Sequence, residues 1–316
     1  MKCCLILLMT TAILHSDILY QTDFEEFSVG LNQWGMGEGW SSNDNTSGAQ
    51  SIDDDVLPAL LKTASLGFTR PGSTFTTVAL ELGYDPTATG LPVVQIDTLV
   101  GIEDSTNNRR DDFFVTFYNT AGQRLARIRF DNQSIDAFET QFGIWREDSN
   151  TQFDTQVDFV HGEIFPLFAT IDLENNTWTA DFGGIPLFED AQFTNRAGPI
   201  TLGFLAYEWD LTAPFPDFHG DNFLLVADLT VRTVNTIPVP ETTSSFDATG
   251  TINLTWQTEP GYIDQVQFSD DLETWEDTLP DSTFDNVTTS ETVNFTDSTG
   301  NLPGIRYYRV RRTPDL

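Results

Sequence analysis

The feature that most constrains the fold of this chain is a strict alternation of apolar and polar residues between short turns. Residues 169–188, ATIDLENNTWTADFGGIPLF, contain two alternating segments, one ending at an Asn-Asn pair and the next at a Gly-Gly pair. In the second segment, Trp178, Ala180 and Phe182 fall on one face and three polar side chains fall on the other. Successive side chains of a strand point to opposite faces of a sheet, so the pattern predicts half-buried β-strands.

The same pattern recurs along most of the chain, and no convincing amphipathic helix interrupts it. Residues 113–119, FFVTFYN, are apolar on both faces, as expected for a central strand. They lead through NTAGQ, a hairpin loop with Gly122, into the alternating residues 125–130. A further strand is predicted over residues 224–234. Many strands at short spacing predict an all-β fold, an antiparallel β-sandwich of the jelly-roll type.

A break in the alternation predicts two domains. At residues 235–245, NTIPVPETTSS combines two prolines with threonine and serine and has no periodic apolar face. Such a composition is typical of an extended linker. We therefore expect a first domain over residues 17–235, a linker over 236–245 and a smaller β-sandwich over 246–316, where alternation resumes.

The N-terminal segment predicts secretion. Residues 1–16 contain one lysine, an apolar run and then small and polar residues, which is the organisation of a cleavable signal peptide. The apolar run is too short for a permanent membrane anchor. Both cysteines, Cys3 and Cys4, lie in this segment, so we expect no disulfide and no cysteine metal site in the mature chain. The prediction is a secreted or cell-surface protein without membrane insertion.

The charge balance excludes two classes of partner. The chain has 48 acidic and 15 basic residues, which gives a formal net charge of -33. A surface this negative repels nucleic acid and anionic membranes, and it suits a salty medium in which screening removes the self-repulsion. An alternative role for the carboxylates, as cation ligands, explains only a few of them.

Four segments of the first domain carry a resemblance to a known family. They are TDFEEFSVG near the mature N-terminus, DDFFVTFYNTAGQRLARIRFDN, IDLENNTWTADFGGIPLF and GDNFLLVADLTV. In order and content they resemble the concanavalin A-like (laminin G-like) jelly rolls of secreted marine bacterial proteins, of the planctomycete and verrucomicrobial type. The second domain is similar to fibronectin type III-like modules in INLTWQTEPGY, QVQFSDDLETWEDT and RYYRVRR, although no seventh strand follows these segments.

The resemblance admits both glycan-degrading enzymes and lectin-like binders, so the catalytic residues decide between them. Glucanases of this fold carry E-x-D-x-x-E on one strand, with the nucleophile and the acid on the same face. The only E-x-D here is Glu208-Trp209-Asp210, which lacks the third carboxylate, and two prolines soon after it predict a loop. We therefore expect no catalysis. The alternative is an atypical hydrolase site formed by Glu208, Asp210 and His219.

The resemblance also implies a structural calcium ion between the first and last strands of the jelly roll. The corresponding family positions match Asp23, Glu25 and Asp228, and Asp221, at the turn into the last strand, is a further candidate. Calcium takes about six to eight oxygen ligands, from carboxylates and carbonyls. The alternative is that these are solvated acids of an acid-rich chain. No other cofactor is expected.

Aromatic side chains are the candidates for sugar binding, because pyranose faces stack on aromatic rings while nearby polar groups bond the hydroxyls. Four aromatic residues with charged or glycine neighbours are the predicted ligand-binding residues, although each is also compatible with packing: Trp34, Trp145, Tyr207 and Trp209. The remaining tryptophans are predicted to lie in the cores: Trp40, Trp178, Trp256 and Trp275.

Together these observations predict a secreted, non-catalytic binding protein that recognises carbohydrate or extracellular matrix through the first domain. An enzyme with an unfamiliar site is the second hypothesis, and carboxylates with raised pKa values in one cleft would favour it. The third is a structural protein of the cell envelope or extracellular matrix, which predicts flat surfaces and bound cations.

Overall fold

The computed structural model describes most of the chain, namely residues 17–54, 56, 62–132, 142–148, 151–198, 200–234, 240, 242–246, 251–271, 274–285, 289–297 and 306–314. The predicted signal peptide, residues 1–16, lies outside the described residues. There are two compact units, one spanning Ser16–Val234 and the other including Asn235–Leu316. In the described part, no helix is long and apolar enough to cross a membrane.

Among the described residues, seven antiparallel strands form one sheet of the first unit, in the order β11-β10-β9-β8-β15-β6-β3. Their bounds are β3 (Trp40–Ser42), β6 (Phe75–Tyr84), β8 (Asp112–Tyr118), β9 (Arg124–Phe130), β10 (Phe142–Asp148), β11 (Gln152–Phe159) and β15 (Leu202–Asp210). β8 and β9 form the predicted hairpin, in which Gly122 has a φ of 71° that a side chain would strain. β15 lies between β6 and β8 in the sheet.

The other sheet of this unit has nine strands within the described residues, in the order β14-β13-β12-β7-β16-β5-β4-β2, with β1 paired to β16. Their bounds are β1 (Ile18–Thr22), β2 (Gly30–Leu31), β4 (Gln50–Asp53), β5 (Thr63–Gly67), β7 (Val93–Glu103), β12 (Ile164–Asp172), β13 (Thr177–Phe182), β14 (Ile185–Gln192) and β16 (Phe223–Val234). In the part of the chain that the structure describes, three short helical turns join strands: η1 (Trp34–Met36), α1 (Pro86–Thr89) and η2 (Pro216–Phe218).

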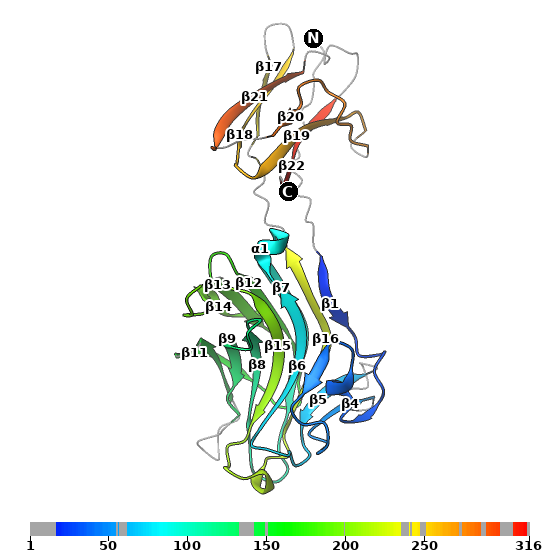
Figure 1. Cartoon of the computed structure of the whole chain (residues 1–316), viewed down its shortest axis with the longest axis vertical. Coiled ribbons are helices and arrows are strands. Elements are labelled where there is room, and N and C mark those ends of the chain that lie inside the picture. Colours follow the sequence, from blue (N-terminus) through cyan, green and yellow to red (C-terminus); the bar gives the residue numbers. More distant parts are fainter. Residues whose placement is uncertain are drawn as a thin grey trace. The chain divides into compact units, whose positions relative to one another are not determined.

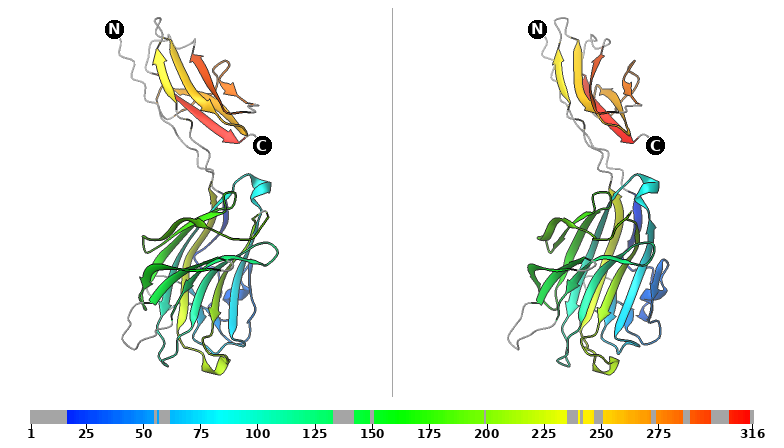
Figure 2. Two further views of the ribbon diagram at one scale, coloured as in Figure 1. Left: turned by 90° about the vertical axis from the view of Figure 1, so that its left-hand side faces the viewer. Right: turned by 60° about the vertical axis from the view of Figure 1, so that its left-hand side comes forward.

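The two sheets of the first unit form a β-sandwich around one continuous apolar core (Figures 1 and 2). Alternation decides which side chains enter the core. Trp178, Ala180 and Phe182 of β13 are buried, as predicted, and the polar residues between them are partly exposed. Burial of such side chains supplies about 25 cal/mol per Å² of apolar surface. The predicted all-β, antiparallel sandwich is confirmed for this unit.

The described residues of the second unit form two three-stranded antiparallel sheets, β17-β18-β21 and β20-β19-β22. The bounds are β17 (Thr243–Phe246), β18 (Ile252–Thr258), β19 (Tyr262–Ser269), β20 (Thr283–Phe284), β21 (Glu291–Asp297) and β22 (Tyr307–Pro314). β17 pairs with β18, so residues 243–245 belong to a strand and the predicted linker extends too far. Threonine and serine are tolerated in an edge strand, and pairing satisfies their backbone groups.

A small separate core holds the second unit together. Ile252, Leu254 and Trp256 share its apolar face, as the alternation predicts. The prediction for Trp275 is wrong. Its ring is only half-buried and lies outside the strands, where the guanidinium of Arg309 sits 4.2 Å from the ring centre. A cation over an aromatic face stabilises such a ring at the surface without burying it.

Candidate functional site

Three of the four aromatic residues predicted to bind sugar lie in the core of the first unit. Trp34, Tyr207 and Trp209 have no exposed surface. The ring of Trp34 packs against those of Tyr207 and Trp40, with centroid distances of 5.3 Å in both cases. The prediction is therefore wrong for these three, because a fully buried ring cannot stack on an external sugar.

Local sequence explains why these three rings are buried. Tyr207 and Trp209 occupy the inward positions of β15, alternating with outward ones. Trp34 lies in the turn η1 beside Gly35 and Gly37, and a Cβ at Gly37 would overlap the ring of Phe27. The glycines beside Trp34 thus mark close packing. The fourth predicted residue, Trp145 in β10, remains half-buried and projects opposite to the core residue Ile144.

The segment of Glu208 and Asp210 is strand β15 up to Asp210, and the predicted loop begins only after it. Both carboxylates project from the outer face of the seven-stranded sheet. Glu208 is fully buried and accepts hydrogen bonds from Thr116 Oγ1 (2.7 Å) and Tyr118 Oη (2.5 Å). Burial raises the pKa of Glu208 in spite of these hydrogen bonds and the nearby arginines.

Glu208 belongs to a layer of paired charges on this outer face, which we call the polar layer. Its other members come from strands β8, β9 and β10: Asp112, Thr116, Tyr118, Arg127, Arg129 and Glu147. Arg127 Nε lies 2.5 Å from Glu147 Oε2, and Arg129 Nη2 lies 2.8 Å from Asp112 Oδ2. Burial raises the pKa of Asp112 to about 6, although the Arg129 guanidinium opposes the shift.

The alternative hydrolase site is not assembled in this structure. His219 packs against Trp209, with ring centroids 6.1 Å apart. Trp209 points inward from β15, whereas Glu208 and Asp210 point outward, so the histidine and the carboxylates lie on opposite sides of the strand. Glu208 also has no exposed surface through which a substrate could reach it.

Two of the four predicted calcium ligands do meet. Asp23 and Asp228 line one cavity of about 450 Å³, together with four further residues: Gln21, Thr22, Glu26 and Thr230. Asp228 lies at an irregularity in the pairing of β16 and has a φ of 47°. Glu25 does not line this cavity. Glu26 takes its place there and accepts a hydrogen bond from Thr22 Oγ1 (2.6 Å).

Asp221 is separate from this cavity, so the structure does not bring the four predicted calcium ligands together. Its carboxylate accepts hydrogen bonds from Ser105 Oγ (2.6 Å) and from the backbone N–H of Thr106 (2.7 Å) and Asn107 (3.1 Å). Burial alone would raise the pKa of Asp221, but these hydrogen bonds outweigh burial and lower the pKa to about 2. Within the described residues, no three His, Cys, Asp or Glu side chains are placed to hold a metal ion.

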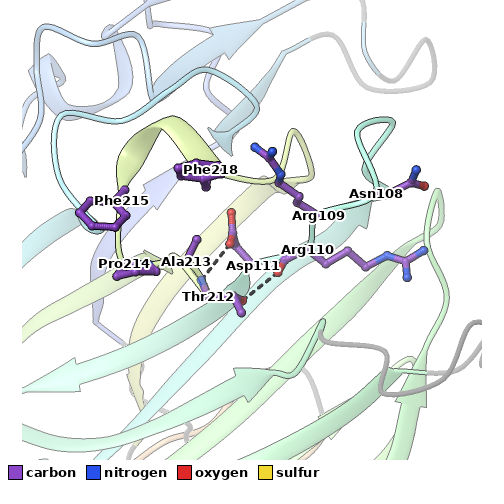
Figure 3. Close-up of a pocket in the computed structure, with 9 residues that line it drawn as sticks. All are labelled: Asn108, Arg109, Arg110, Asp111, Thr212, Ala213, Pro214, Phe215 and Phe218. Atoms are coloured by element: carbon purple, nitrogen blue, oxygen red, sulfur yellow. Dashed lines mark hydrogen bonds between the residues drawn. The ribbon is translucent and has the colours of Figure 1, made fainter.

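A cavity of about 640 Å³ lies where the β7–β8 connection meets the β15–β16 connection, and we call it the loop cavity (Figure 3). Two of its residues are strongly exposed aromatics, Phe215 (60%) and Phe218 (50%). Nine residues line it: Asn108, Arg109, Arg110, Asp111, Thr212, Ala213, Pro214, Phe215 and Phe218.

A buried aspartate holds the two connections of the loop cavity together. Asp111 accepts hydrogen bonds from the backbone N–H of Thr212 (2.9 Å) and Gly220 (2.6 Å), and burial raises its pKa. Asn222, also fully buried, donates from Nδ2 to the Asp111 carbonyl oxygen (3.1 Å). A Cβ at Gly220 would overlap the Arg109 carbonyl oxygen, so only glycine permits this approach.

The two arginines of the loop cavity differ in their partners. Arg110 points away from the phenylalanines and forms a bidentate pair with Asp104, at 2.8 and 2.9 Å (Figure 3). The guanidinium of Arg109 lies 4.9 Å from the centre of the Phe218 ring and donates one hydrogen bond to the Asp217 carbonyl oxygen (3.3 Å). Within the described chain Arg109 has no ion pair, and this hydrogen bond uses only one of its five N–H donors.

The loop cavity contains none of the predicted sugar-binding residues, which are all tryptophan or tyrosine, whereas its aromatic residues are phenylalanines. A usable signal was present in APFPDF, residues 213–218. Prolines at alternate positions prevent pairing in a central strand, so neither Phe215, which lies between them, nor Phe218, two residues after the second proline, is expected in a regular core strand. An aromatic residue that cannot enter the core must lie at the surface or against another loop.

Comparisons with known proteins give distant structural likenesses only. No family model and no curated protein sequence matches the chain. A carbohydrate recognition domain of Emp47p matches with 7% identity over 67% of this chain and 96% of that one, at a TM-score of 0.44. The alginate lyase Aly36B, in complex with an alginate trisaccharide, matches with 9% identity over 71% and 100%, at 0.45. A sialidase matches with 7% identity over 65% of this chain but only 18% of its own length, at 0.43. Similarity this low carries no assignment of function.

Proposed function

We propose that the first unit is a non-catalytic carbohydrate-binding β-sandwich and that the loop cavity is its glycan site. The observation that carries the proposal is the pair of exposed rings, Phe215 and Phe218, beside the available donors of Arg109. A sugar ring presents an apolar face and a rim of hydroxyl groups. The cavity offers both complements, aromatic faces and hydrogen-bond donors, in one place.

The shape of the loop cavity favours binding over catalysis. Its volume lies within the range of roughly 300–1,000 Å³ that is typical of small-molecule sites. Hydrolysis of a glycosidic bond needs two carboxyl groups beside the bond. Asp111 is the single carboxylate among the nine lining residues, and its hydrogen bonds to Thr212 and Gly220 occupy it in holding the loops. Loops fixed in this way lose little conformational entropy when a ligand binds.

Secretion, and the identities of the domains, belong to the same proposal. The apolar N-terminal segment supports export, and a glycan binder works outside the cell. We assign the first unit to the jelly-roll type and the second to a fibronectin type III-like spacer, supported by its two three-stranded sheets. A structural calcium ion is proposed only at Asp23 and Asp228, whose carboxylates line one cavity between the turn after β1 and the bulge of β16.

A glycan array with the mature protein, followed by calorimetric titration of the best ligand, tests the proposal. Three proteins are compared: wild type, the double variant Phe215→Ala/Phe218→Ala, and Ile185→Ala as a control that also removes an exposed apolar side chain. We expect binding by wild type and by the control, and its loss in the double variant. An array without any bound glycan, or equal binding by all three proteins, would reject the loop cavity as a glycan site.

A further inference from the structure

We infer that the first unit has a second ligand site, for a neutral sugar ring, on the outer face of the nine-stranded sheet. A cavity of about 450 Å³ lies there, across strands β2, β4, β5 and β16, and we call it the sheet cavity. It shares no lining residue with the loop cavity. The residues that carry the argument are Leu31, Ser51, Asp53, Ser65, Phe68 and Phe223.

Strand register builds the floor of the sheet cavity. Leu31, Ser51 and Ser65 are consecutive pairing partners across β2, β4 and β5, so their side chains lie in one row on one face. The residue after Ser51 and the residue after Ser65, Ile52 and Leu66, point the other way into the core. Small serines therefore stand where larger residues would fill the outer face, and the resulting hollow has a hydroxyl floor.

The polar groups of this floor are already organised. The hydroxyl oxygens of Ser51 and Ser65 lie 2.5 Å apart, and both hydroxyls are bonded to Asp53 Oδ2, at 2.8 and 2.7 Å. Ser51 and Ser65 are 7% and 8% exposed, whereas Asp53 is only partly buried. The carboxylate thus faces the cavity from a fixed position, where it can accept hydrogen bonds from ligand hydroxyls.

The wall of the cavity is the aromatic ring of Phe68, a residue whose backbone has an unfavourable conformation. Phe68 has a φ of 66°, although a bulky residue at positive φ is an outlier, and its ring is 60% exposed. The ring meets that of Phe223 edge-on, with centroids 5.8 Å apart, and the Phe68 N–H donates to the Asn222 carbonyl oxygen at 3.2 Å. Strained residues of this kind concentrate at ligand sites, where the geometry serves binding.

Charge selects the class of ligand. Among the described residues that line the sheet cavity there is no arginine or lysine, and the charged one is Asp53. A uronic acid or a sulfated sugar would be repelled there, in a chain of net charge -33. A neutral ring with hydroxyl donors and an apolar face fits the floor and the wall together. This inference stands independently of the loop cavity.

Amide chemical-shift mapping by NMR tests the inference, with cellobiose, maltose and mannobiose as neutral probes and digalacturonic acid as the acidic probe. It is run on wild type and on Phe215→Ala/Phe218→Ala, so that a failure of the loop cavity does not affect the result. We expect at least one neutral probe to shift the amides of Ser51, Ser65 and Phe68 in both proteins. Digalacturonic acid should leave these amides unchanged.

Two variants then assign the contacts. Phe68→Ala removes the aromatic wall of the sheet cavity, and Asp53→Asn removes its charge. Each substitution should lower the affinity for the neutral probe about tenfold or more, whereas Ile185→Ala should leave the affinity unchanged. Phe68→Gly also relieves the positive φ, so we expect it to fold at least as stably as wild type and still to lose binding. Absence of shifts with all three neutral probes, or unchanged affinity in Phe68→Gly, would overturn the inference.

Discussion

The polar layer and the loop cavity both contain charged and aromatic side chains, but these are buried and paired in the polar layer and more exposed in the loop cavity. In the polar layer, Glu208 and Glu147 are almost completely buried, and both lie within ion-pair distance of Arg127 on β9, at 3.9 and 2.5 Å. In the loop cavity, Arg109 has no ion pair within the described chain and two phenylalanines face solvent. A raised carboxyl pKa is therefore a poor guide to function here, because the Glu208 carboxyl is inaccessible and its neighbours satisfy it.

The largest expected effect comes from removing one cation of the polar layer. Arg127→Ala leaves Glu147 and Glu208 buried without their shared partner, so we expect the free energy of unfolding to fall by about 3–5 kcal/mol. Urea denaturation measures the change. Arg196→Ala, at an exposed position, is the matched control and should change stability by about 0.5 kcal/mol or less. Equal effects of the two variants would show that the layer contributes no stability.

A second prediction concerns the pH dependence of the same layer. The pKa of Asp112 is raised in the folded state to about 6, so the folded protein binds more protons than the unfolded chain between about pH 4 and pH 6. Its contribution therefore makes stability fall as pH rises through that window, by about 3 kcal/mol at most. Asp112→Asn should remove this fall, measured as the difference between wild-type and variant denaturation curves across pH 4–7. A difference that stays constant with pH would contradict the prediction.

In contrast to the polar layer, the aromatic residues of the loop cavity should contribute to ligand binding and little to stability. Phe215→Ala/Phe218→Ala removes exposed rings, so the free energy of unfolding should change by about 0.5 kcal/mol or less. Affinity for the glycan identified on the array should nevertheless fall about tenfold or more. Calorimetric titration and thermal melting of the same samples give both values. A strongly destabilised variant would show that these two rings stabilise the fold, and it would contradict the proposed difference between the two regions.

The smallest expected effect is that of calcium at the cavity of Asp23 and Asp228. A ligand at about ten times its Kd stabilises the folded state by about 1.4 kcal/mol. We expect a correspondingly small rise in Tm on adding calcium, reversed by chelator and absent in Asp228→Ala. Asp221→Ala is the control, because the carboxylate of Asp221 lies outside this cavity and accepts hydrogen bonds from Ser105 and Thr106. Identical responses of both variants to calcium would remove the proposed site.

Much of the fold was predictable and little of the site was. The strands around Trp178, the β8–β9 hairpin at Gly122 and the final strand of the first unit follow from alternation and turn residues. The prolines after Asp210 predict a loop at Glu208, but they lie beyond the end of β15 and do not interrupt the pairing of that strand. Trp34 and Phe215 show the remaining difficulty, since both are aromatic residues in irregular segments, yet one is fully buried and the other 60% exposed.

The sequence by itself determined which residues of each strand face inward, because a strand alternates with a period of two whatever it pairs with. The tertiary structure alone decided which segments meet. Asp111 and Thr212 come from connections about a hundred residues apart, and their hydrogen bond forms only because β8 and β15 are neighbours in the sheet. Strand order depends on long-range pairing, which local patterns do not encode, and the loop cavity exists because of that order.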